Sequence, residues 1–465
     1  MNMVSAEQLR NGLIAATGDF PTAAENATED LPLNKLYVPP SHRKALSPDH
    51  PLVVGMRGAG KTYWWLKLQD EKALQLVFGA LKTRLECKPG FSNTKTDPLD
   101  APTKSILGDL KRLGYSAQEV WRTVMCWHVP SLQVMMPHDS WSKRVNWCKE
   151  NIETIEQQLY LADRQLLQEG RTLLVLFDAL DATADTLQDR HEWLKGLLQV
   201  MLEFRGFRAL RAKAFVRSDL MSDPALFAFP DGSKLQYDQV TLDWGRSDLY
   251  ALLWQALANA PSGYGEVFRN WSQTIIRAID WHERDSLWLV PENLRSDEDM
   301  QRELFHAIAG PWMGKDPRRG FPYTYLPNHL GDAFRKVSPR SFMEAIKKAA
   351  EMTEVKHPQH EFALHYEDIK RGVQHASTIR VGDLLQEYDW IDDVMEPLRI
   401  VKLVLPSAAE YIQQIWQLAG QPDRLDDLIE LGILEASRDK KRLSMPDVYR
   451  VGFGLGLRGG IRPVR

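Results

Sequence analysis

The chain has 465 residues, of which 44% are hydrophobic and 26% are charged, and its formal net charge is -4. This length exceeds that of one ordinary hydrophobic core and predicts two to four structural units. The composition is typical of a globular protein, and the small negative charge excludes a global attraction to nucleic acid. Any nucleic-acid binding therefore needs a local basic surface.

The cysteine and hydropathy patterns predict a protein of the reducing cytoplasm. The three cysteines, Cys87, Cys126 and Cys148, lack the spacing of a zinc site or a disulfide framework, so we expect buried apolar side chains. No run of about 18 apolar residues occurs, and residues 1–13 lack the apolar core of a signal peptide. We therefore expect no membrane-spanning helix.

Residues 1–50 are expected to form an N-terminal lead-in to the first strand. Proline is frequent at 31–51, which predicts an extended approach. Within this approach Tyr37 is a candidate to stack on a base, and His42 or Arg43 is a candidate to contact phosphate. A plain rigid segment is the alternative interpretation.

Residues 55–62 read Gly-Met-Arg-Gly-Ala-Gly-Lys-Thr, the pattern of a phosphate-binding loop. An apolar run precedes the loop and a helix-compatible segment follows it, which is the setting that this pattern requires. Backbone N–H groups are expected to surround the β-phosphate, Lys61 to reach the β- and γ-phosphates, and Thr62 to bind Mg²⁺. The expected nucleotide-binding residues are Gly55, Arg57, Gly58, Ala59, Gly60, Lys61, Thr62 and Tyr63. The alternative is a glycine-rich turn before an ordinary helix.

A second element, residues 173–177, predicts a buried parallel strand that ends at Asp178. Open α/β sheets place their chemistry at this end of a strand, so we expect Asp178 to hold Mg²⁺. Asp181 is a candidate to orient or activate the attacking water. Capping of a following helix is an equal alternative for Asp181.

A third strand is predicted at 214–216 and ends in Arg217 and Ser218. A polar side chain at this strand tip can sense the γ-phosphate, and Arg217 and Ser218 are the candidates for this role. The alternative is a surface turn that opens a helix at Asp219.

Together the three elements resemble the ATPase modules of the STAND and KAP-like branch related to AAA+ proteins. Residues 55–62 match the Walker A box, 173–181 resemble the Walker B box, and 215–219 resemble the sensor-1 strand. The likeness covers about residues 36–350. It implies ATP and Mg²⁺ as ligands, and a homo-oligomer.

GTPases are the competing class of phosphate-loop protein. They need a DxxG motif after the second strand, but Asp178 is followed by Asp181 where that motif has glycine. They also need an NKxD clamp, and residues 34–37 lack its aspartate and precede the loop. Adenine is therefore the expected base.

More than a hundred residues separate Lys61 from Asp178, which predicts an insertion. KAP relatives often carry membrane helices there, whereas residues 120–147 are interrupted by charged residues and proline. The predicted fold is α/β, with a parallel P-loop sheet, a helical insertion, a helical lid and a winged-helix-like α+β domain. The expected boundaries are 51–240 for the core, about 80–170 for its insertion, 241–377 for the lid and 378–465 for the C-terminal domain.

Arginines in the lid are further candidates. Arg340, at the start of a helix predicted from Ser341, resembles a sensor-2 arginine that couples γ-phosphate charge to lid closure. An exposed arginine at a helix start is the equal alternative. Arg318 and Arg319 are weaker candidates for an arginine finger that reaches a neighbouring subunit.

The C-terminal segment resembles a winged helix. A helix and strand are predicted at 425–436, a basic turn at 437–442 and a returning strand at 443–445. The basic wing and the arginine-rich tail, which includes Arg450, can contact nucleic-acid phosphates. The presumed helix is acidic, and this favours protein contact.

The leading hypothesis is a regulatory ATPase that switches or assembles a partner. Because no nuclease, protease or TIR signature occurs, the effector is expected on a separate polypeptide, and the resemblance implies bacterial antiphage defence. The alternative is a DNA-binding ATPase of the origin-recognition or loader type that uses the winged helix. A small-molecule kinase is a third hypothesis, without an acceptor-site motif to support it.

Overall fold

The computed structural model describes residues 4–18, 36–78, 84–93, 96–221 and 223–457. Contacts divide the chain into two compact units, and each has its own core. The sheet unit contains the described part of Val38–Asp243. The helical unit contains the described parts of Met1–Thr22 and Pro32–Tyr37 together with Trp244–Arg465.

The sheet unit is built on five parallel strands in the order β2-β3-β4-β1-β5. The strands are β1 (Leu52–Gly55), β2 (Arg84–Phe91), β3 (Arg171–Phe177), β4 (Leu210–Arg217) and β5 (Val240–Thr241). Because all strands are parallel, their carboxyl ends meet at one edge. The three strands predicted from apolar runs are confirmed as β1, β3 and β4.

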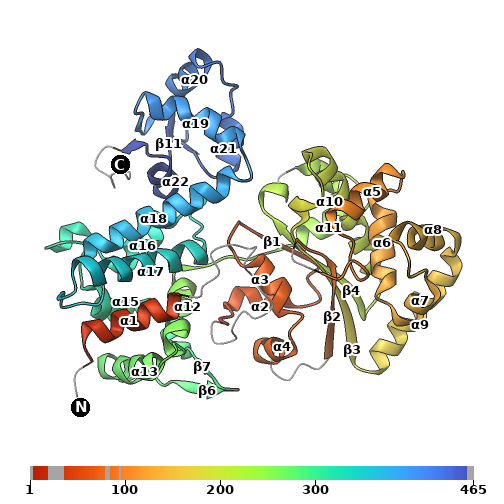
Figure 1. Cartoon of the computed structure of the whole chain (residues 1–465), viewed down its shortest axis with the longest axis horizontal. Helices are drawn as coiled ribbons and strands as arrows, with labels where there is room; N and C mark the ends of the chain where they lie inside the picture. The colour runs from red at the N-terminus through yellow and green to blue at the C-terminus, as the bar shows by residue number, and fades with distance from the viewer. Residues whose placement is uncertain (1–3, 19–35, 79–83, 94–95, 222, 458–465) are drawn as a thin grey trace. The chain divides into compact units, whose positions relative to one another are not determined.

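Alternate residues of the central strands are buried on opposite faces of the sheet. On β3, Val175 and Phe177 join the core beneath α6 (Ala117–Trp127) and α10 (Leu187–Phe204). Figure 1 shows these helices and α9 on one side of the sheet, and α2, α3 and α4 on the other. The bounds of these helices are Ile152–Gln168 for α9, Pro40–Leu46 for α2, Lys61–Lys67 for α3 and Glu71–Phe78 for α4.

The predicted helical insertion at about 80–170 is not wholly helical, because it begins with the edge strand β2. Most of β2 is only half-buried, so its sequence lacks the apolar run that revealed the central strands. Pro89 is compatible with this position, since an edge strand has one side without ladder hydrogen bonds. Helices follow the strand as α5 (Lys104–Arg112), α6, α7 (Pro130–Met135), α8 (Trp141–Glu150) and α9. Two small helical elements, η5 (Pro224–Phe227) and α11 (Gly232–Tyr237), precede β5.

The helical unit starts at the N-terminus of the chain. Helix α1 (Ala6–Thr17) packs against α12, α13 and α17, and its Leu9, Leu13 and Ala16 are buried in the core. The predicted lead-in at 1–50 is therefore divided between the units, since α2 belongs to the sheet unit. The other elements are α12 (Arg246–Ala258), α13 (Tyr264–Ile275), the hairpin β6 (His282–Arg284) and β7 (Leu287–Leu289), α14 (Glu292–Ser296), α15 (Glu298–Ala309), η6 (Pro317–Arg319), α16 (Pro322–Leu330), α17 (Pro339–Lys356) and α18 (Tyr366–Leu385).

Helices α17 and α18 form a tightly packed pair. A Cβ atom on Gly372 would lie 2.1 Å from the carbonyl oxygen of Ala345, so only glycine allows this approach. Helix α18 continues without a break through Ser377 and Thr378, where the predicted lid was expected to end. Its C-terminal half packs against α22, which belongs to the following domain.

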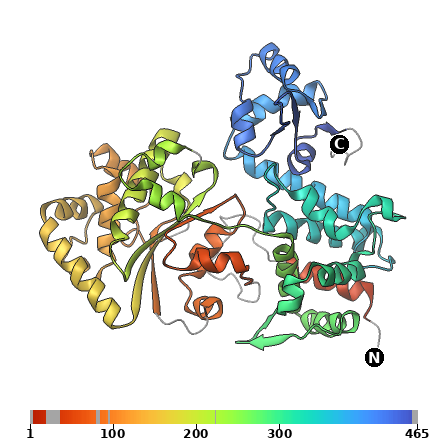
Figure 2. The same cartoon turned by 180° about the vertical axis from the view of Figure 1, so that it is seen from behind.

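The C-terminal domain, drawn in blue in Figures 1 and 2, is winged-helix-like. Its antiparallel sheet has the order β10-β11-β9, and the turn between β10 and β11 forms the wing. The predicted helix, strand, basic turn and returning strand are confirmed. The elements are α19 (Trp390–Ile400), β8 (Val404–Leu405), β9 (Ser407–Ala408), α20 (Ala409–Leu418), α21 (Leu425–Glu430), β10 (Glu435–Ala436), β11 (Arg442–Ser444), α22 (Asp447–Gly452) and β12 (Gly456–Leu457).

Among the helices of the described ranges, none combines the length and the apolar character needed to cross a membrane.

Candidate nucleotide-binding site

The phosphate-loop residues connect β1 to α3 through a glycine-dependent turn. Gly58 has a φ of 77° and Gly60, which caps α3, has a φ of 99°. Residues other than glycine rarely adopt this backbone conformation, so the loop requires glycine at both positions. The amide of Ala59 donates to the carbonyl of Met56 over 3.2 Å and closes the turn. Arg57 is half-buried in this turn.

Two buried tryptophans hold α3 against the rest of the sheet unit. The indole N–H of Trp64 donates to Nδ1 of His42 over 3.1 Å, and that of Trp65 donates to the carbonyl of Leu176 over 3.1 Å. These bonds connect α3 to α2 and to β3. The first turn of α3, which carries Lys61 and Thr62, is thereby positioned by the core.

His42 is fully buried, and both of its ring nitrogens are used within the protein. Since Nδ1 accepts the Trp64 bond, Nε2 carries the proton and donates to the carbonyl of Asp243 over 3.1 Å. Burial lowers the pKa of His42 to about 4, so the ring is neutral at neutral pH. The candidate role of His42 in contacting phosphate is therefore wrong.

Lys61 extends its ammonium group across the loop. Its Nζ donates to the carbonyls of Gly55 and Met56 over 2.9 and 2.8 Å. Burial, followed by the charge of Arg217, lowers the pKa of Lys61 to about 8, while nearby carboxylates led by Asp178 oppose this shift. An ammonium group here is close enough to the ends of β3 and β4 to respond to the charges there.

Asp178 follows β3 and is 1% exposed. Its amide donates to the carbonyl of Phe91 over 2.8 Å, which extends the ladder between β2 and β3 to the site. Burial raises the pKa of Asp178 to about 6, although the side chain of Thr62 and the charge of Lys61 act in the opposite direction.

The Asp178 carboxylate has the properties of a metal ligand. Its Oδ2 is buried and has no hydrogen-bond partner among the described residues, which is costly for an isolated oxygen. Mg²⁺ binds oxygen ligands such as a carboxylate and a hydroxyl. Asp178 and Thr62 therefore fit a Mg²⁺ ion. The next residue, Ala179, has a φ of 52°, a conformation that alanine adopts only under strain.

Strand β4 lies between β1 and β3, so its tip brings Arg217 between the loop and Asp178. Arg217 forms a two-point ion pair with Asp219, with Nε–Oδ1 and Nη2–Oδ2 distances of 3.0 and 2.8 Å. It also lies 3.5 Å from Asp181. The structure thus brings together three predicted site residues from strand ends far apart in the chain: Asp178, Asp181 and Arg217.

Asp219 is a site residue that the sequence patterns did not reveal. Its position two residues after Arg217 at a strand tip was the available signal, but helix capping explained it equally well. Asp219 and Asp181 each lie in a short 3-10 turn, η4 (Asp219–Met221) and η3 (Leu180–Ala182). Each aspartate therefore belongs to a short turn and also contacts Arg217.

Tyr63 packs inward. Its ring is edge-on to Trp64, with 5.3 Å between ring centroids, and burial raises its pKa. Its hydroxyl is buried without a hydrogen-bond partner among the described residues. The predicted contribution of Tyr63 to nucleotide binding is thus restricted to its backbone N–H in the first turn of α3.

Four further candidates, Arg340, Arg318, Arg319 and Tyr37, belong to the helical unit. Arg340 is 15% exposed and pairs with Asp383 of α18 over 3.1 Å, so it is not the exposed arginine of the alternative interpretation. Arg318 and Arg319 are exposed in η6. Tyr37 is buried, and its hydroxyl donates to Asp248 over 2.8 Å.

Comparisons with known proteins identify no close relative. No protein-family model matches the chain, and no curated protein is similar to it in sequence. The structure of Cdc6p from Pyrobaculum aerophilum is similar at 14% identity and a TM-score of 0.30, with 90% of this chain and 94% of that chain covered. The ORC2 protein from Aeropyrum pernix, in ADPNP-ADP complexes, is similar at 16% identity and a TM-score of 0.40, with 90% and 93% covered. Identities and scores this low assign the chain to no family.

Proposed function

We propose that the chain binds ATP with Mg²⁺, hydrolyses it, and uses this cycle as a switch. The observation that carries this proposal is the buried Asp178 carboxylate, which interacts with Thr62 and retains one unpaired oxygen. The same edge of the sheet holds Lys61 in a loop with left-handed glycines. A glycine-rich turn without a ligand would not need a buried acid beside its threonine.

Each group has a separate role in this proposal. The loop amides and Lys61 bind the β- and γ-phosphates, and Thr62 and Asp178 hold Mg²⁺. The bound ion neutralises phosphate charge. Asp181 orients the attacking water, and Arg217 donates to the γ-phosphate as negative charge develops there.

The Arg217 ion pairs support a switching role. In the structure the guanidinium is held by Asp219 and lies near Asp181. A γ-phosphate competes with these carboxylates for the same donors, because all of them bind the guanidinium fork. ATP and ADP therefore stabilise different arrangements of the β4 tip, which is the differential contact that a nucleotide switch needs.

Substitutions at the loop and at β3 test this proposal separately. Lys61→Ala is expected to abolish ATP binding, whereas Asp178→Asn is expected to preserve binding of ATP itself, to weaken that of Mg²⁺-ATP and to remove Mg²⁺-dependent hydrolysis. Lys72→Ala, which removes an exposed lysine of α4, is the control and should retain both. Nucleotide titration and phosphate release measure the two effects. Full turnover in both site variants would contradict the assignment.

The output of the switch is proposed to be contact with a partner protein. Helix α21 exposes Asp426 and Glu430, and β10 exposes Glu435, so the surface of these two elements carries acidic side chains. Such a surface repels phosphate and suits a basic protein surface. A separate effector, a homo-oligomer and a role in antiphage defence remain predictions from the resemblance.

DNA binding is a second candidate output, and the wing favours it. All basic residues of the turn between β10 and β11 and of the first position of β11 are exposed: Arg438, Lys440, Lys441 and Arg442. Arg450, predicted to belong to the basic tail, is instead buried and pairs with Asp447, so it has no part in such a surface. The tail from 458 onward lies outside the described residues.

DNA-dependent turnover distinguishes the two outputs. If the wing binds DNA, duplex DNA should stimulate ATP hydrolysis, and the effect should fall steeply with salt. Replacing the four wing residues by glutamine should then reduce the salt slope of DNA affinity by about one for each phosphate that the wing no longer neutralises. No effect of DNA on turnover would leave the protein-partner output as the proposal.

A further inference from the structure

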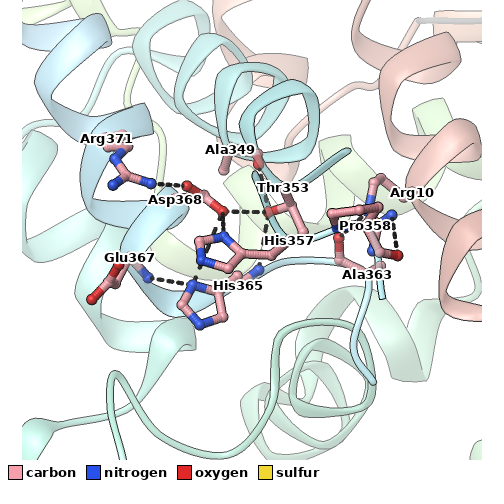
Figure 3. Close-up of polar contacts among 10 residues, drawn as sticks. All are labelled: Arg10, Ala349, Thr353, His357, Pro358, Ala363, His365, Glu367, Asp368 and Arg371. Carbon is pink, nitrogen blue, oxygen red and sulfur yellow. Dashed lines mark hydrogen bonds and ion pairs between the residues drawn. The ribbon is translucent and has the colours of Figure 1, made fainter. Parts of the chain in front are cut away.

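A group of metal-ligand side chains lies at the turn between α17 and α18, far in sequence from the phosphate loop (Figure 3). His357 is the C-cap residue of α17 and His365 is the N-cap residue of α18. Their rings stack with centroids 3.8 Å apart. One nitrogen of each ring and one carboxylate oxygen of Glu367 lie within 4.8 Å of one another.

A buried carboxylate, Asp368, orients the imidazole ring of His357. Asp368 is fully buried, and its Oδ2 accepts hydrogen bonds from His357 Nδ1 over 2.7 Å and from the Thr353 hydroxyl over 3.2 Å. Its other oxygen accepts from Arg371. Since His357 donates through Nδ1, its Nε2 retains a lone pair. A carboxylate that fixes the tautomer of a histidine in this way is the usual second partner of a metal-binding imidazole.

His365 is also held in place. Its backbone amide donates to the Thr353 hydroxyl over 3.0 Å, so one threonine contacts both the histidine backbone and Asp368. The His365 Nδ1 accepts the amide of Glu367 over 3.3 Å, a long bond that a stronger ligand can replace.

We propose that His357, His365 and Glu367 bind a borderline divalent transition-metal ion, with Zn²⁺ as the first choice. Two imidazoles and one carboxylate form a known zinc ligand set and leave a fourth position for water or an outside donor. Imidazole ligands discriminate against Mg²⁺ and Ca²⁺, so this site is chemically distinct from the oxygen site proposed at Asp178.

Closing the site around an ion requires the side chains to turn. Tetrahedral zinc with bonds of about 2.0–2.2 Å places its donors about 3.4 Å apart. Glu367 is exposed, and its carboxylate has no hydrogen bond within the described part of the chain, so it can rotate toward the rings. Together with Asp368 it supplies the negative charge that offsets both the ion and the N-terminus of α18. A bound ion would clamp the ends of α17 and α18 together.

Metal titration of the full-length protein tests this site. The protein is freed of metal with a chelator and titrated with Zn²⁺ by calorimetry in excess Mg²⁺, which occupies oxygen sites. Co²⁺ titration followed by visible absorption reports the coordination geometry. We expect one equivalent of Zn²⁺ and an intense tetrahedral Co²⁺ spectrum.

Three variants make the result specific. Glu367→Gln and His365→Ala should each lower Zn²⁺ affinity at least about tenfold and remove the tetrahedral spectrum. His282→Ala is the matched control, because His282 is exposed in the same unit and faces a carboxylate, Asp280, over 3.4 Å. It should bind like the unsubstituted chain. If His365→Ala unfolds, Glu367→Gln decides the question.

Equal affinity in all four proteins, an octahedral Co²⁺ spectrum, or no Zn²⁺ binding in excess Mg²⁺ would each overturn the proposal. Zn²⁺ should also raise the Tm of the unsubstituted chain and leave that of Glu367→Gln unchanged, because only a ligand that binds the folded state stabilises it. Nucleotide binding is not involved in any of these measurements.

Discussion

Thr62 and Asp178, more than a hundred residues apart, bring a hydroxyl and a buried carboxylate into interaction. This contact connects the phosphate loop to the end of β3 and brings the two proposed Mg²⁺ ligands together. It also affects the protonation of the site, because burial raises the pKa of Asp178 whereas Thr62 and Lys61 lower it.

The pH dependence of Mg²⁺-ATP binding should have two limbs. The pKa of Asp178 is raised to about 6, so below that pH its carboxyl is protonated and a poor metal ligand. The pKa of Lys61 is lowered to about 8, so above that pH its positive charge is lost. We therefore expect the highest affinity between these values, with a decline of up to about tenfold per pH unit outside them.

Nucleotide titrations from acid to alkaline pH measure this profile. Asp178→Asn removes the carboxyl, and the acid limb should become shallower while the alkaline limb remains. An unchanged acid limb in that variant would show that another group, such as the nucleotide phosphate, causes it.

Removal of Arg217 should impair the chemical step more than nucleotide binding. Because the guanidinium is proposed to donate mainly as charge develops on the γ-phosphate, Arg217→Ala should lower kcat by about 100-fold with little change in ATP affinity. Asp219→Asn weakens the two-point ion pair that positions Arg217, and a smaller loss, about tenfold, is expected. Single-turnover hydrolysis measures both.

Arg208→Ala is the control for this pair, since Arg208 is exposed shortly before β4. It should leave turnover unchanged. A loss of ATP affinity equal to the loss of kcat in Arg217→Ala would instead indicate a ground-state binding role.

The buried bond between Trp64 and His42 should contribute to the stability of the sheet unit. Trp64→Phe keeps an aromatic ring but removes the N–H donor, which leaves His42 Nδ1 buried without its partner. We expect the free energy of unfolding to fall by about 1–3 kcal/mol. Urea denaturation followed by fluorescence and circular dichroism measures this change.

His42 should also make stability depend on pH in one direction. Its folded-state pKa is about 4, below the ordinary 6.5, so the unfolded chain binds more protons between these values. Stability from this group is present above about pH 6.5 and is lost as pH falls toward 4, by up to about 1.4 kcal/mol per pH unit. His42→Gln should reduce the dependence, whereas His138→Gln, at an exposed histidine of the same unit, should preserve it. Identical pH profiles for both variants would contradict this assignment.

Two glycines of α18 provide a matched test of helix packing. Gly372→Ala places a Cβ 2.1 Å from the Ala345 carbonyl oxygen, so the helices must separate, and we expect a loss of about 1–3 kcal/mol. At Gly382 no atom lies within 4 Å of the added Cβ, and Gly382→Ala should stabilise the helix by about 0.5–1 kcal/mol. Thermal unfolding measures the two changes, and equal effects would show that the close approach at Gly372 is unimportant.

Local patterns made the central elements predictable. The phosphate-binding pattern at 55–62 lies within eight consecutive residues. The buried strands β3 and β4 each show an apolar run that ends in a polar residue. Parallel strands bring such ends to one edge, so the proximity of Asp178 and Arg217 followed from strand order alone. The wing was predictable for a similar reason, because its basic turn separates two short strands.

Other features depend on partners that are distant in sequence. The edge strand β2 is half-exposed and has no apolar run, so only its pairing with β3 identifies it. His42 belongs to a proline-rich segment without an apolar pattern, and its burial becomes evident only from Trp64 and Asp243, which enclose it. Arg340 likewise pairs with Asp383 of the next helix. The polar pairs are set by packing across the core, which periodicity and composition do not encode.

From the amino-acid sequence alone it follows that this chain carries a phosphate loop before a helix, an acidic residue after a buried strand, and a winged-helix-like end. Those features are local, because backbone conformation and hydrophobic periodicity act over a few residues. The folded chain was needed to show that Asp178 retains an unpaired oxygen, that Asp219 holds Arg217, and that two helix ends bring His357 and His365 into contact. Such contacts arise from burial and close approach, which depend on the whole packed unit.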